Sequence, residues 1–142
     1  MKTRLSKIID EAASRKKNED KVATLQRYDS PQLRELLAYA LNPNIEFKLP
    51  DTEPPYTPTD GINLEEKLYN SIRKFENLVG VWNGQEYTAV KKMRLVNRER
   101  IFIDILEEVH PEDAKLVLKV KDKDIGIKPK IAKDAFPGFF QF

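Results

Sequence analysis

Side chains suited to acid–base or metal chemistry are few in this sequence of 142 residues, which has one histidine and no cysteine. The histidine, His110, stands directly before a proline that opens a helical pattern. A histidine in that position is typically a helix cap or an exposed side chain. Catalytic triads built on histidine, and zinc sites built on histidine and cysteine, are therefore excluded.

The other acid–base candidates are two adjacent acid pairs, Glu107–Glu108 and Glu112–Asp113. We expect both pairs at helix ends and on the surface, where no apolar surroundings shift their pKa values. The five glycines are scattered and form no phosphate-cradling loop. The sequence therefore predicts a protein that is not an enzyme and that needs no cofactor and no metal.

Basic residues gather in two stretches, although the net charge is only +2. The first stretch contains Glu99 as its only acid and five basic residues: Lys91, Lys92, Arg94, Arg98 and Arg100. The second contains two acids, Asp122 and Asp124, and seven lysines: Lys115, Lys119, Lys121, Lys123, Lys128, Lys130 and Lys133. Clustered positive charge is what binding to a phosphate backbone requires. Ordinary solvated faces are the simpler interpretation of the same pattern.

Four phenylalanines lie in the last seven residues: Phe136, Phe139, Phe140 and Phe142. An exposed aromatic tail of Phe139, Phe140 and Phe142 would insert into a pocket of a partner protein. Alternatively, Phe136, Phe139 and Phe140 fold back into the core. Trp82 and Tyr87 could stack on nucleic-acid bases or pack against the protein. Packing is the more common role of an aromatic pair beside an Asn-Gly turn.

Secondary-structure elements must position these residues. Along most of the chain apolar residues recur with a period of 3.6, and apolar–polar alternation with a period of two is scarce, which predicts an all-α fold. We expect one domain over residues 1–142, a compact bundle of about six to seven short helices. Its helical N-terminal part covers residues 1–47 and its helical C-terminal part residues 63–142. Between them, residues 48–62 contain four prolines and predict an extended surface loop.

Capping signals and apolar stripes define the expected helices. They cover residues 3–14, 19–28, 31–41, 63–79, 89–96, 97–109, a helix that starts at Pro111, and 129–136. Ser30 and Pro31 mark one helix start, and Asn63 with Glu66 approximates a capping box for another. Asn83-Gly84 between Trp82 and Tyr87 indicates either a small hairpin or a turn.

The C-terminal pattern resembles the end of the helical N-terminal DNA-binding domain of phage ATP-dependent DNA ligases. The similar residues are Asp122, Asp124-Ile125-Gly126, Ile131-Ala132 and Phe136-Pro137-Gly138. About eighteen residues are similar in detail, and the order of the first helices is compatible. Lysines at positions 121 and 123 stand where the ligase turn carries arginines, and lysine is the less directional phosphate ligand. The Lys-x-Asp-Gly nucleophile motif of ligases is absent.

The chain also looks like a member of an uncharacterised family of tailed-phage proteins. That similarity involves residues 34–37, the loop of residues 49–56, the His110–Ala114 cap and the Ala135–Gly138 end. It implies no activity of its own. Both resemblances imply a location in the cytoplasm of an infected host cell, in agreement with the absence of any apolar run of membrane-spanning length.

The ligase resemblance implies a stand-alone DNA-binding domain that contacts the phosphates of duplex DNA, nicked or intact, without sequence specificity. The residues expected at DNA are Lys119, Lys121, Lys123, Gly126, Lys128, Lys130 and Lys133, with Lys91, Lys92 and Arg94. The alternative is a protein-interaction module of a phage replication or transcription complex. That module would act through the aromatic tail, for example on a sliding clamp or a polymerase.

Overall fold

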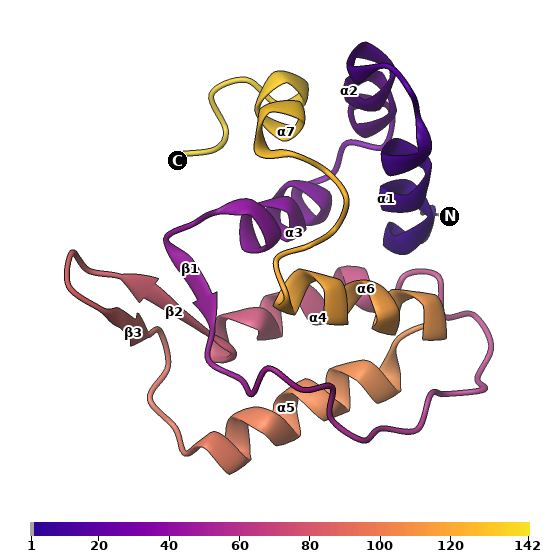
Figure 1. Ribbon diagram of the computed structural model, residues 1–142. Coiled ribbons are helices and arrows are strands. Elements are labelled where there is room, and N and C mark those ends of the chain that lie inside the picture. The colour runs from indigo at the N-terminus through magenta and orange to yellow at the C-terminus, as the bar shows by residue number, and fades with distance from the viewer. Residues whose placement is uncertain (1) are drawn as a thin grey trace.

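The computed structural model describes residues 2–142. Seven α-helices, one 3₁₀ helix and three strands make up this part of the chain (Figure 1). In chain order they are α1 (Leu5–Ser14), α2 (Asn18–Arg27), α3 (Pro31–Leu41), β1 (Ile45–Phe47), α4 (Lys67–Ser71), η1 (Ile72–Asn77), β2 (Val79–Trp82), β3 (Tyr87–Ala89), α5 (Leu95–Glu108), α6 (Pro111–Lys121) and α7 (Pro129–Ala135).

The small antiparallel sheet corrects the expectation of an all-α fold, whereas the helical character is confirmed. Its order is β1-β2-β3, with Ile45 opposite Val81 and Val81 opposite Thr88. The hairpin at Asn83-Gly84 forms, and Gly84 adopts a φ of +100° that other residues rarely tolerate. Strands of three or four residues are too short to show a period of two in the sequence.

Two expected helices differ from the structure. The helix expected over residues 63–79 is confined to α4 and η1, and Asn63 stands before it with a φ of +57° instead of capping it. Residues 89–96 are not helical, because β3 ends at Ala89 and α5 begins only at Leu95. The capping predictions at Ser30 and His110 are confirmed, since both side chains accept a backbone hydrogen bond from the first turn of their helix.

The proline-rich residues 48–62 form no helix or strand, as expected. Leu49 and Tyr56 pack against the core and hold this loop down. Ile62, at the end of the same loop, is 83% exposed.

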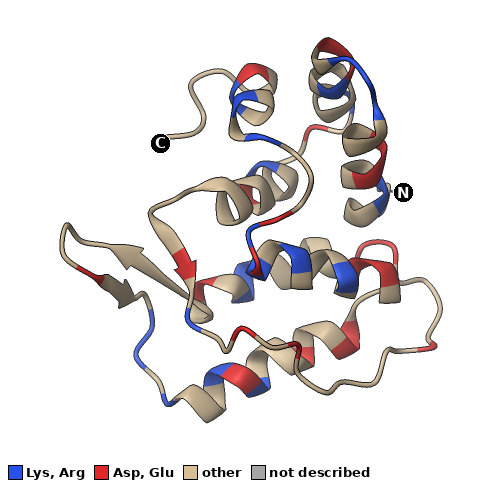
Figure 2. Ribbon diagram, in the orientation of Figure 1, with Lys and Arg blue, Asp and Glu red and all other residues tan. Residues whose placement is uncertain are grey.

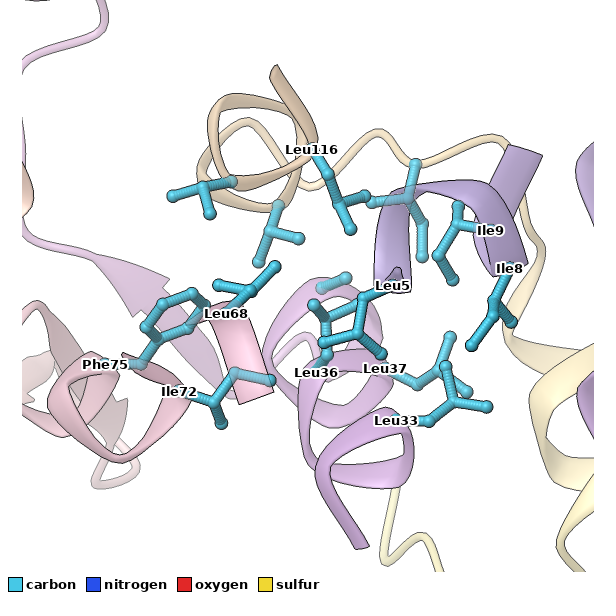
Figure 3. Packing of buried hydrophobic residues seen from close by; sticks show 14 of the residues in the cluster. Leu5, Ile8, Ile9, Leu33, Leu36, Leu37, Leu68, Ile72, Phe75 and Leu116 are labelled. Atoms are coloured by element: carbon cyan, nitrogen blue, oxygen red, sulfur yellow. The ribbon is translucent and has the colours of Figure 1, made fainter. Parts of the chain in front are cut away.

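One apolar cluster joins both ends of the chain. Leu5, Ile8 and Ile9 of α1 meet Leu36 and Leu37 of α3, and Leu116 of α6 closes the same cluster (Figure 3). α1 lies against α6 and α2 lies against α7. The last two helices therefore complete the packing of the first two. None of the helices in residues 2–142 has the length and apolar character that crossing a bilayer requires.

Candidate nucleic-acid interface

Two of the lysines expected at DNA, Lys121 and Lys123, have their ammonium groups bound inside the protein. The side chain of Lys121 is 5% exposed, and its Nζ donates to the carbonyl of Pro50 at 2.8 Å. Lys123 Nζ donates to the carbonyls of Tyr39, Asn42 and Ile45 at 2.9, 2.6 and 2.9 Å. In this structure neither ammonium is presented to a phosphate. Their role is to attach the α6–α7 turn to residues 39–50.

The backbone of Lys123 also explains its position. Its φ of +60° lies in the left-handed region, directly after the end of α6, where glycine or asparagine is usual. From there the side chain reaches the carbonyls that end α3 and begin β1. Burial lowers the pKa of Lys123 to about 8. The three carbonyl acceptors oppose that shift, because each holds one proton of the ammonium.

The other four C-terminal lysines expected at DNA, Lys119, Lys128, Lys130 and Lys133, are exposed. Lys130 pairs with Asp134 at 2.9 Å, and Lys133 Nζ lies 5.0 Å from the centre of the Phe142 ring. In residues 2–142, neither Lys119 nor Lys128 forms an ion pair. Exposed cations without an acidic partner are the ones that can neutralise phosphates.

The fold brings a further basic run near this group. Gly126 has a φ of +78°, and a Cβ added there would lie 3.5 Å from the Cβ of Ala13. The α6–α7 turn therefore runs along the last turn of α1. Three exposed basic residues, Arg15, Lys16 and Lys17, follow that helix directly. These three residues were not among those expected at DNA, although three consecutive basic residues are a visible signal in the sequence.

Lys91, Lys92 and Arg94 are exposed, but they lie at the other end of the molecule from α7 (Figure 2). Lys91 approaches Glu76 at 3.9 Å. Arg98 of the same sequence cluster is buried, and it donates to the carbonyls of Asn77 and Lys91 at 3.2 and 3.4 Å. The basic residues thus form two separate groups, and the structure does not join them in one patch.

The aromatic tail folds back on the helices. Phe136 is buried, Phe140 is half-buried against the core, and Phe142 packs on Phe140 with ring centres 5.5 Å apart. Phe139 is 42% exposed, and the Arg34 guanidinium lies 5.3 Å from its ring centre. Phe136 and Phe140 thus pack inward, as expected if the tail folds back into the core. Phe139, which was expected to fold back with them, lies on the surface.

Replacing Phe140 by alanine is expected to lower the melting temperature by about 3 °C, because about 1 kcal/mol of apolar burial is lost. Phe139→Ala is the matched control and should leave the melting temperature within about 1 °C. Circular dichroism melting measures both. If both variants melt at the temperature of the parent, the Phe140 side chain as well as that of Phe139 lies on the surface.

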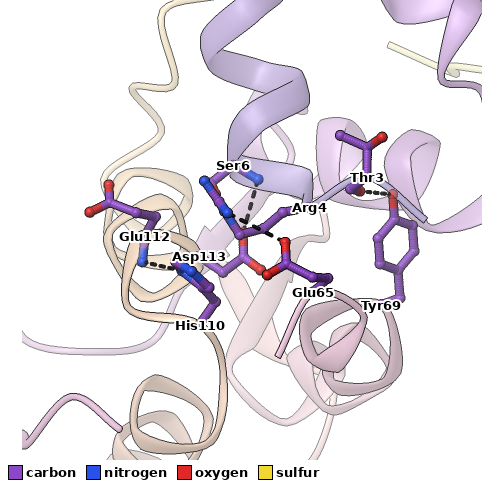
Figure 4. Close-up of polar contacts among 8 residues, drawn as sticks. All are labelled: Thr3, Arg4, Ser6, Glu65, Tyr69, His110, Glu112 and Asp113. Carbon is purple, nitrogen blue, oxygen red and sulfur yellow. Dashed lines mark hydrogen bonds and ion pairs between the residues drawn. The ribbon is translucent and has the colours of Figure 1, made fainter. Parts of the chain in front are cut away.

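One acid of the helix-end pairs is buried, contrary to expectation. Asp113 is fully buried, and its Oδ1 accepts the N–H of Ser6 in the first turn of α1 at 2.9 Å (Figure 4). Its Oδ2 has no hydrogen-bond partner in residues 2–142. Burial raises the pKa of Asp113, and the Ser6 hydrogen bond and the nearby Arg4 oppose the rise. The sequence placed it on the surface because its partner is 107 residues away.

The rest of this polar cluster is structural as well. His110 Nδ1 accepts the N–H of Glu112 at 3.0 Å, which makes it the cap of α6. Arg4 donates to Ser6 and pairs with Glu65 at 3.4 Å, and the Tyr69 hydroxyl donates to the Thr3 carbonyl (Figure 4). Within the described residues, no group of three histidine, aspartate or glutamate side chains gathers as a metal site.

The comparison with protein families gives one result. A model described as "Family of unknown function (DUF6433)" matches residues 8–127. The chain belongs to this family. DUF6433 membership agrees with the expectation of an uncharacterised family, while the phage source and the ligase resemblance stay predictions. The searches of curated proteins and of solved structures found no match.

The DUF6433 match includes the Lys123 turn and Gly126, and it ends before α7. It therefore covers the residues that attach the turn to α3 and β1. The exposed Lys128, Lys130 and Lys133 lie beyond it.

Proposed function

We propose that this chain is a non-enzymatic phage protein that binds the phosphates of duplex DNA without sequence specificity. The observation that carries the proposal is the set of exposed, unpaired lysines beside the α6–α7 turn. Lys119 and Lys128 belong to it, and Lys16 and Lys17 extend it. The resemblance of residues 121–138 to a ligase DNA-binding domain also supports it. In that role residues 2–142 act as a ligase-type DNA-binding domain.

Lys121 and Lys123 act in this proposal as positioning residues. Their ammonium groups hold the turn by hydrogen bonds to carbonyls of residues 39–50. A turn fixed in this way keeps the flanking exposed lysines at constant spacing, which reduces the entropy lost on binding. Phosphate contacts of this kind position a protein on DNA but read no bases.

A salt titration tests the proposal. We expect the triple variant K16Q/K17Q/K128Q to bind a nicked duplex roughly tenfold more weakly than the parent chain at moderate salt. The slope of log K against log salt should fall by about 3, because three phosphate contacts are removed. Fluorescence anisotropy with nicked, intact and single-stranded DNA measures both quantities.

The charge-matched control is K67Q/R73Q/K115Q, which removes three exposed basic residues from α4, η1 and α6. It should bind DNA as the parent does. A salt-independent affinity, or equal weakening by the two triple variants, would contradict the proposal. If only K91Q/K92Q/R94Q weakens binding, the DNA site lies at the opposite end of the molecule.

A further inference from the structure

Apolar surface is concentrated at the end of the molecule that carries the β2–β3 hairpin and the start of α5. Five of the seven exposed large apolar side chains in residues 2–142 lie within residues 81–96, which we call the β3 shoulder. They are Val81, Trp82, Val90, Leu95 and Val96, and each is 42% to 62% exposed. Contiguous exposed apolar residues of this kind mark interaction sites more often than isolated ones.

The two edges of the sheet differ in how they are protected. At the β1 edge, Lys123 donates to the carbonyl of Ile45 and so satisfies one outward-facing acceptor of that strand. β3 is the other edge, and in the described chain no strand lies beyond it. An uncovered edge presents unpaired N–H and C=O groups to which another strand can add.

The register of the hairpin shows which groups face outward. Val90 N–H donates to Val79 and Asn83 N–H to Glu86, so residues 86, 88 and 90 bond toward β2. Residues of an antiparallel strand alternate in this respect. The backbone N–H and C=O groups of Tyr87 and Ala89 therefore point away from β2, toward the free side.

An apolar groove lies on one face of this edge. Its volume is about 280 Å³, and it is lined by Ile45, Val79, Val81 and Val90 together with side chains of α3. Glu35 and Glu76 also line it, and Lys91 approaches Glu76 at 3.9 Å. Glu35 belongs to α3 and Glu76 to η1, so the negative charge of the groove comes from these two helices.

Positively charged residues follow the end of β3 in the chain. Residues 87–98 contain no acid. Lys92 and Arg94 are exposed, and neither forms an ion pair with another residue of the described chain. A ligand that follows β3 past Val90 meets these two cations.

We propose that the β3 shoulder binds an extended segment of a partner protein that adds a strand to β3. The main chain of the segment pairs with Tyr87 and Ala89, and its apolar side chains cover Val81 and Val90. Its carboxylates lie beyond Val90, next to Lys92 and Arg94. The charge complementarity selects an acidic segment, and the free edge selects an extended one. This inference goes beyond the proposed DNA binding, because it uses different residues at the other end of the molecule.

The test uses a synthetic peptide of about six residues, the usual strand length, with valines in the half that pairs with β3 and glutamates in the half that lies next to Lys92 and Arg94. In ¹⁵N-resolved NMR titrations of the full chain we expect shifts confined to residues 80–96. Ala89→Pro should weaken binding at least tenfold. Proline removes the outward N–H of an edge strand without removing a bond to β2. Ala89→Ser, which keeps that N–H, is the matched control and should bind as the parent does.

A second variant tests the charge independently of the strand backbone. K92E/R94E changes two exposed side chains, so the fold is retained, and the peptide should bind roughly tenfold more weakly. Replacing glutamate by lysine in the peptide should weaken binding to the parent chain similarly. The proposal is overturned if Ala89→Pro, shown folded by its spectrum, binds the peptide unchanged, or if no shifts occur in residues 80–96. It is also overturned if duplex DNA shifts these residues and displaces the peptide, which would make the shoulder a nucleic-acid site.

Discussion

Replacing Lys123 by methionine is expected to lower the free energy of unfolding by about 3 kcal/mol. Methionine keeps most of the apolar stem but removes the ammonium that binds the carbonyls of Tyr39, Asn42 and Ile45. Hydrogen bonds from a charged donor are worth about 1.5–3 kcal/mol each. The desolvation of the ammonium, which also lowers its pKa, offsets part of that gain.

Urea unfolding measures the loss, and Lys119→Met is the matched control because Lys119 is exposed on the preceding helix turn. The control should differ from the parent by less than about 0.5 kcal/mol. Lys123→Gly separates the side chain from the backbone. Glycine relieves the left-handed φ and should recover up to about 1 kcal/mol relative to methionine. A methionine variant as stable as the parent would show that the three carbonyls do not depend on Lys123.

Replacing Asp113 by alanine is expected to lower the free energy of unfolding by about 2 kcal/mol at neutral pH. The N–H of Ser6 loses its acceptor, and α6 loses its polar link to the first turn of α1. Asp113→Asn keeps an acceptor oxygen for Ser6 and removes the buried charge, so at neutral pH it should be at least as stable as the parent. Chemical unfolding of the three proteins compares them directly.

The same residue should make stability depend on pH. Burial raises the pKa of Asp113 in the folded chain above its ordinary value of 3.8. The protonated form therefore favours the folded state: this contribution is complete below about pH 4 and is lost as the pH rises through the raised pKa. Each unit of displacement is worth about 1.4 kcal/mol. As the pH rises over this range, the parent should therefore become less stable relative to Asp113→Asn. A constant difference would contradict a raised pKa.

The features that the sequence predicted correctly depend on residues close together in the chain. Ser30 with Pro31, and His110 with Pro111, define helix starts within three residues, and both caps form. The proline-rich loop and the apolar stripes of α1 and α3 are local patterns of the same kind. Local propensity decides such features, because no distant partner competes with it.

The features that were missed depend on distant partners. Lys123 and the carbonyls that it binds are 78 to 84 residues apart, and nothing in the composition of residues 121–128 distinguishes a bound lysine from a free one. Residues 63–66 carry a capping pattern, but Asn63 has a φ of +57°, the helix begins only at Lys67, and its second half is the 3₁₀ helix η1. The two basic stretches could therefore be located from the sequence, while the binding of Lys121, Lys123 and Arg98 inside the protein could not.

The packing of both chain ends into one cluster has a consequence for biosynthesis. α1 and α2 leave the ribosome before their partners α6 and α7 have been made. At about 10 residues per second, roughly 10 s pass before these helices meet. During that interval the apolar side chains of Leu5, Ile8 and Leu25 lack their final neighbours. We therefore expect the nascent chain to be a substrate for chaperones that hold apolar segments until α6 and α7 have emerged.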